Sequence, residues 1–131
     1  MLVSGGRSKE RIVLFGMEGV GKSLALLDIA ARVHPHTVWI IDNDNAWDRM
    51  LEGSTVDGAE VGVREEWRWN GRAWTADDEW VVEDGNVVIF HAEGWAANID
   101  AIREVTERAE PNDWCGVDSG SALWDDVQAW F

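Results

Sequence analysis

The feature that most constrains the fold of this chain is a glycine-rich loop between two apolar segments. Residues 16–23 fit the spacing G-x-x-x-x-G-K-[ST] of a phosphate-binding P-loop. Residues 11–15, just before the loop, form an apolar run typical of a strand buried on both faces. Apolar residues at helical spacing follow the loop, over residues 24–33. We therefore expect a strand, a P-loop and a helix that opens at Lys22.

The residue types in this loop suit a polyphosphate ligand. Glycines let consecutive backbone N–H groups turn towards phosphate oxygens, and the positive end of the following helix adds to the attraction. Lys22 would reach the β and γ oxygens, and the Ser23 hydroxyl would bind Mg²⁺, which prefers oxygen ligands. The alternative is a glycine-rich turn with a solvated lysine. The expected nucleotide-binding residues are Gly16, Met17, Glu18, Gly19, Val20, Gly21, Lys22, Ser23 and Leu24.

Length and charge limit the class of protein. At 131 residues the chain has room for a single domain, residues 1–131, and its formal net charge is -14. Only Lys9 and Lys22 are lysines among its 11 basic residues, so it lacks a basic stripe that would bind a nucleic-acid backbone. The single cysteine, Cys115, excludes an internal disulfide and is expected to be buried in a strand. No apolar run approaches the roughly 20 residues that cross a bilayer, so we expect a cytoplasmic protein with no membrane partner.

Acidic residues follow the second apolar run, residues 37–41. Asp42 and Asp44 are two positions apart, so their side chains point the same way in an extended backbone. They follow the carboxyl end of a predicted parallel strand, where open α/β sheets bind ligands. The alternative is that Asp44 or Asn45 caps a short helix over residues 46–52, and both interpretations can hold together.

Residues 54–86, which we call the insert, differ in character from the rest of the chain. The dipeptide Asn70-Gly71 lies between alternating aromatic and polar residues, which is a strong signal for a β-hairpin. Trp67 and Trp69 would share one face of it. We expect an inserted antiparallel hairpin on a mostly parallel sheet, with its tryptophans packed on the domain. The alternative is that these rings stack on a nucleotide base.

The third apolar run, residues 86–91, predicts another buried strand. An amphipathic helix is expected over residues 98–109, with Ile99, Ile102 and Val105 on one face. His91 and Glu93 lie at the carboxyl edge of the strand, where we expect exposed loop residues without an assigned role; the alternative is that they approach the site.

The fourth predicted strand, residues 114–119, contains an acidic residue near its end. An apolar strand that ends in Asp118 has the form of a Walker B element, in which the carboxylate reaches the Mg²⁺ site and holds a coordinated water. The alternative is that Asp118 ends the strand or caps the next helix, which we expect over residues 121–131.

These segments together resemble RecA-like ATPases, in particular the small recombination ATPases of phages. Residues 16–23 look like the RecA-type P-loop, and residues 117–124 are similar to that family's Walker B segment. Residues 41–48 (IDNDNAWD) are similar to the RecA-type run IDAEHALD, in which the glutamate orients the attacking water. The resemblance implies a three-layer α/β fold, places Asp44 at the glutamate's position, and implies side-by-side oligomers on DNA.

The resemblance also sets what we expect of function and extent. It implies Mg²⁺-dependent ATP binding and hydrolysis in DNA recombination or repair, in the host cytoplasm if the gene belongs to a phage. The later strand and DNA-binding loops of the family have no counterpart here, so we expect an N-terminal part of a longer protein or a shortened relative. The alternatives are a terminase-type DNA-packaging ATPase, a small-molecule kinase, or a nucleotide-binding module without catalysis.

Overall fold

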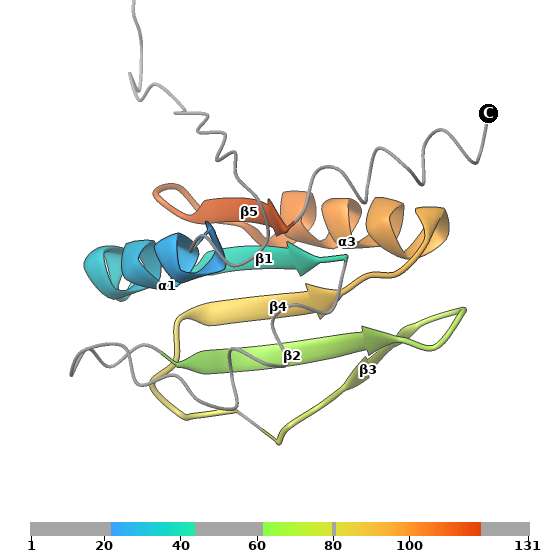
Figure 1. Ribbon diagram of the computed structural model, residues 1–131, viewed down its shortest axis with the longest axis horizontal. Helices are drawn as coiled ribbons and strands as arrows, with labels where there is room; N and C mark the ends of the chain where they lie inside the picture. Colours follow the sequence, from blue (N-terminus) through green and yellow to red (C-terminus); the bar gives the residue numbers. More distant parts are fainter. Residues whose placement is uncertain (1–21, 44–61, 80, 119–131) are drawn as a thin grey trace, which may run out of the picture.

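The computed structural model describes residues 22–43, 62–79 and 81–118 as an α/β unit (Figure 1). In this part of the chain a five-stranded sheet has the order β3-β2-β4-β1-β5. Strands β2, β4, β1 and β5 are parallel, and β3 is antiparallel to β2. The elements are α1 Lys22–Val33, β1 Val38–Asp42, β2 Val63–Trp69, β3 Trp74–Ala76, β4 Val87–His91, α3 Trp95–Arg108 and β5 Trp114–Asp118.

The apolar runs of the sequence account for the central strands. Strands β1, β4 and β5 lie within one residue of the predicted ones, and the side chains of β1 and β4 are buried along their whole length. Helix α1 opens at Lys22 as expected. The predicted strand over residues 11–15 and the predicted helices over residues 46–52 and 121–131 lie outside the described residues.

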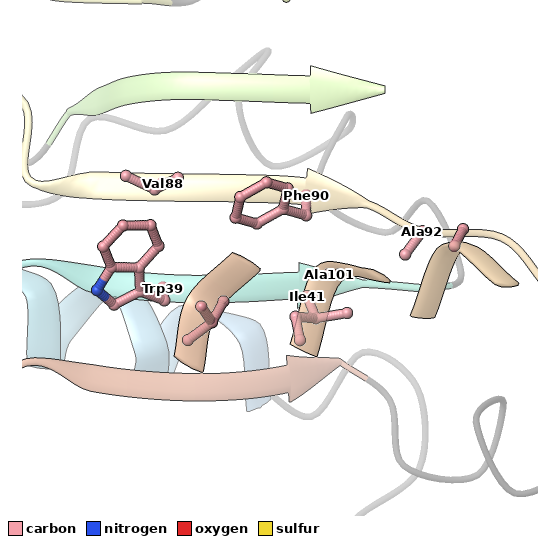
Figure 2. Packing of buried hydrophobic residues seen from close by; sticks show 8 residues of the cluster. Trp39, Ile41, Val88, Phe90, Ala92 and Ala101 are labelled. Carbon is pink, nitrogen blue, oxygen red and sulfur yellow. The ribbon is translucent and has the colours of Figure 1, made fainter. Parts of the chain in front are cut away.

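The two helices cover opposite faces of the sheet. Leu27 and Ala30 of α1 pack against alternate residues of β1 and β4, including Ile40 and Ile89. The remaining residues of these strands point to the α3 face, where Trp39, Ile41, Val88 and Phe90 meet the alanines of α3 (Figure 2). Successive side chains of a strand point to opposite faces of the sheet, and here a helix covers each face. Every side chain of these strands is therefore apolar up to the polar edge, which explains the unbroken runs in the sequence.

The buried face of α3 differs from the predicted one. Ala97, Asn98, Ala101 and Val105 are buried, whereas Ile99 and Ile102 are 45% and 41% exposed. The helix meets the sheet mainly through small side chains such as Ala97 and Ala101. The larger Ile99 and Ile102 are therefore not part of the contact. Within the described part of the chain, neither helix is long and apolar enough to cross a membrane.

Strands β2 and β3 form the predicted hairpin around Asn70 and Gly71, with Trp69 opposite Trp74. Trp67, Trp69 and Trp74 pack on the domain as expected, beside Phe90 on the α3 face. Strand β2 also joins the main sheet parallel to β4, which the sequence did not indicate. The insert therefore extends the sheet on one side and adds to its core.

An irregularity at the start of β2 decides which side chains face which helix. The register against β4 shifts between Val63 and Glu65, and a bulge of this kind changes the alternation of side chains. After the shift, Glu66 and Arg68 point to the α1 face, while Trp67 and Trp69 point to the α3 face. Two charged side chains are thus directed to the same face as the acids of β1 and β5.

Candidate functional site

Four polar residues form one row across the carboxyl ends of the parallel strands. Asp118 pairs in register with Asp42, Asp42 with His91, and His91 with Arg68. Residues in register on neighbouring strands point to the same face, and the alternation within β1 and β4 identifies it as the α1 face. We call Asp118, Asp42, His91 and Arg68 the edge row. On β1 and β4 the edge row lies two residues beyond Ile40 and Ile89, which pack in the cluster under α1.

The first turn of helix α1 is the part of the helix nearest this edge of the sheet. The helix runs opposite to β1, to which a short link after Val33 connects it, so Lys22 lies at the end nearest the carboxyl ends of the strands (Figure 1). The helix also passes over β5, because a Cβ on Gly116 would lie 2.8 Å from a terminal methyl group of Leu26. The partial positive charge of a helix N-terminus therefore faces the side of the sheet that carries Asp42 and Asp118.

The predicted site residues differ in how far the structure describes them. Lys22, Ser23 and Leu24 form the first turn of α1, and Asp118 is 7% exposed at the end of β5. The other predicted nucleotide-binding residues, Gly16, Met17, Glu18, Gly19, Val20 and Gly21, and the predicted catalytic residue Asp44 lie outside the described residues.

His91 is held between carboxylates from two neighbouring strands. Its Nδ1 lies 2.9 Å from Asp42 Oδ2, and its Nε2 lies 2.7 Å from Glu66 Oε1. The side chain of His91 is 4% exposed, and both carboxylates are fully buried. Burial alone would lower the pKa of His91, but the hydrogen bonds to Asp42 and Glu66 outweigh it and raise the pKa from 6.5 to about 9. At neutral pH the ring is an imidazolium that donates from both nitrogens.

Arg68 continues this arrangement towards the hairpin. Its Nη2 donates to Glu66 Oε1 over 3.2 Å, and its Nε donates to Asp77 Oδ2 over 2.8 Å. The hydrogen bond from Arg68 lowers the pKa of Asp77. Charges therefore alternate in sign from Asp77 through Arg68, Glu66 and His91 to Asp42. Each cationic side chain of this set therefore lies between two carboxylates.

A pocket of about 260 Å³ opens beside the edge row. It is lined by Asp42, Asn43, Arg68, Trp69, His91 and Glu93. Asn43 is turned to the other face, where its Nδ2 lies 3.4 Å from Oδ1 of Asn98 on α3. Hydrogen bonds thus fix four of the residues that line the pocket, Asp42, Asn43, Arg68 and His91.

Three of these residues were missed or misjudged from the sequence. His91 is buried and paired, so the expectation of an exposed loop residue is wrong. Glu66 and Arg68 lie in a segment interpreted only as a hairpin, and their contact with the edge row depends on the bulge in β2. For His91 the sequence did contain a signal, because it is a polar residue at the end of an apolar strand. Cys115 is exposed, because the α3 face of β5 is not covered by α3, which corrects the expectation of a buried thiol.

The edge row fits a magnesium ion of the kind that binds with a nucleotide. Such ions use one or two carboxylates together with phosphate oxygens and waters, and do not need a cage of protein ligands. The described residues contain no cluster of three or more histidine, cysteine, aspartate or glutamate ligands arranged around a metal. Asp118 offers hard oxygen ligands on the face where the first turn of α1 opens. Comparisons with protein-family models, curated proteins and solved structures found no match to this chain.

Proposed function

We propose that this chain is a P-loop protein of RecA-like type that binds ATP with Mg²⁺ and hydrolyses it. The observation that carries the proposal is the in-register pair of Asp42 and Asp118, on the α1 face at the edge of the sheet nearest the first turn of α1. The sequence of residues 16–23 supplies the matching half, a phosphate-binding loop that leads directly into α1.

The faces of the sheet that the two helices cover determine from which side α1 reaches β1. Strand β4 leads through α3 to β5, past β1, and crossovers between parallel strands are right-handed in almost all proteins. Because α1 lies on the opposite face, a right-handed crossover through α1 must run in the opposite direction along the sheet. Helix α1 therefore reaches β1 from the side of the sheet on which β5 and Asp118 lie. The packing of Leu26 on Gly116 agrees with a helix that crosses β5 to reach β1.

In this proposal the residues act by positioning and by charge. The loop amides and Lys22 would hold the phosphates, and Ser23 and Asp118 would hold Mg²⁺, which would supply positive charge beside the phosphates. Asp44 orients the attacking water, as the resemblance implies. A role in DNA recombination rests on the resemblance alone, because the charge of this chain does not favour direct contact with DNA.

Equilibrium binding of ATP to the 131-residue chain, with Mg²⁺ and with EDTA, tests the proposal. Hydrogen bonds to charged groups contribute about 1.5–3 kcal/mol, so Lys22→Ala should weaken ATP binding by about tenfold or more. Asp118→Asn should weaken the binding of Mg²⁺ with ATP by about 10–100-fold, while leaving binding in EDTA nearly unchanged. Isothermal titration calorimetry measures both quantities.

Asp78→Asn is the matched control for Asp118→Asn, because it makes the same chemical change at an exposed position in the hairpin region. ATP binding that is equally weak in Asp78→Asn and Asp118→Asn would contradict the proposal. A turnover assay then separates an ATPase from a nucleotide-binding module. Phosphate release that is lost in Asp44→Asn supports hydrolysis, whereas binding without any turnover supports the module.

A further inference from the structure

The buried histidine of the edge row has no place in the function proposed so far. The side chain of His91 is more deeply buried than that of any other histidine in the described residues. A buried side chain with charged partners on both sides costs free energy to desolvate, and an apolar residue would fill the same space at lower cost. Its partners therefore indicate what it does.

The partners of His91 come from the strands on either side of it. Asp42 belongs to β1 and Glu66 to β2, and each accepts one hydrogen bond from the ring. A ring held at both nitrogens cannot turn, and a carboxylate bound to it cannot turn freely either. The Asp42 side chain is thus fixed next in register to Asp118, on the same face of the sheet.

We propose that His91 is a positioning residue for the magnesium site: it fixes the Asp42 carboxylate beside Asp118 and thereby strengthens the binding of Mg²⁺ with nucleotide. This inference rests on the proposed function. In this role His91 acts through Asp42, to which its Nδ1 is hydrogen-bonded. Groups that orient the residues of a metal site from behind typically contribute about 10–100-fold to metal affinity.

Glu66 extends the same role to the insert. It holds the far nitrogen of His91, and Arg68 holds the same oxygen of Glu66 from the other side. Strand β2 of the insert thereby provides the two residues, Glu66 and Arg68, that hold His91 in contact with Asp42. Three consecutive charged contacts, from Arg68 through Glu66 and His91 to Asp42, in this way join the insert to the proposed magnesium site.

The test measures the Mg²⁺ dependence of ATP binding in four forms of the full chain: wild type, His91→Gln, Asp42→Asn and the double variant. We expect His91→Gln to raise the half-saturating Mg²⁺ concentration by about tenfold, with unchanged ATP binding in EDTA. In the Asp42→Asn background, His91→Gln should change it by less than about twofold, because the residue through which it acts is already altered. A residue that only stabilised the fold would shift thermal unfolding and leave the Mg²⁺ dependence unchanged.

Glu66→Gln provides a second variant in case His91→Gln does not fold. The amide oxygen still accepts from Nε2, but the charge that supports the imidazolium is lost, so a smaller shift in the same direction is expected. Wild-type Mg²⁺ dependence in both variants, or a full shift that persists in the Asp42→Asn background, would overturn this inference alone. Failure of the wild-type chain to bind ATP at any Mg²⁺ concentration would overturn the proposed function, and this inference with it.

Discussion

Replacement of Phe90 by alanine should lower the free energy of unfolding by about 3–5 kcal/mol. Phe90 is 1% exposed and lies at the centre of the α3 face. Its ring stacks on Trp39 with centroids 6.4 Å apart, and meets Trp74 edge to face at 5.0 Å. The substitution removes both contacts and leaves a cavity between the sheet, α3 and the hairpin. Denaturation in urea, followed by tryptophan fluorescence, measures the loss.

Ile102→Ala is the control for the cavity argument. Ile102 belongs to α3 but is 41% exposed, so its truncation should change the free energy of unfolding by less than about 1 kcal/mol. Similar losses in the two variants would mean that α3 packs through its isoleucines, and the described core would then be wrong.

Stability should fall as the pH rises from about 6.5 to about 9, by roughly 3 kcal/mol in total from His91. The pKa of His91 is raised in the folded chain, so the folded state binds the proton more tightly than the unfolded state. The contribution is fully present below the unfolded pKa of about 6.5 and is lost as the pH rises through the folded pKa of about 9. Of the described residues that act on the ring, the carboxylates of Asp42 and Glu66 favour its protonated form and the guanidinium of Arg68 opposes it.

Denaturation curves at several pH values measure this loss, with two variants for comparison. His91→Gln should remove most of the pH dependence over this interval. His36→Gln, at an exposed position after α1, should keep the wild-type slope. A wild-type slope in His91→Gln would show that the imidazolium is not the group responsible.

The sequence predicted the centre of the fold well, for a physical reason. Strands β1 and β4 are buried on both faces, so every residue is apolar until the strand reaches the polar edge. Asp42 and Asp118 could be placed at that edge because a polar residue ends each run. The loop before α1 has a spacing that is specific in itself, although most of it lies outside the described residues.

The parts that could not be predicted depend on contacts between distant segments. The parallel pairing of β2 with β4 and the bulge after Val63 decide that Glu66 meets His91, and neither leaves a local pattern. In α3 the contact is made by alanines, which carry little hydrophobic signal compared with the isoleucines beside them. Side chains that act through partners 25 residues away or more are visible only once the sheet order is known.

The central claim is that Asp118 and Ser23 hold one divalent metal ion together with a nucleotide. An anomalous difference map from crystals grown with Mn²⁺ and a non-hydrolysable ATP analogue tests it most directly. We predict a single strong peak at the carboxyl edge, within about 5 Å of the Asp118 carboxylate and in direct contact with the Ser23 hydroxyl, a distance that allows one bridging water at Asp118. A nucleotide-dependent peak elsewhere on the chain, or Asp118 too far away for a bridging water, would contradict the account.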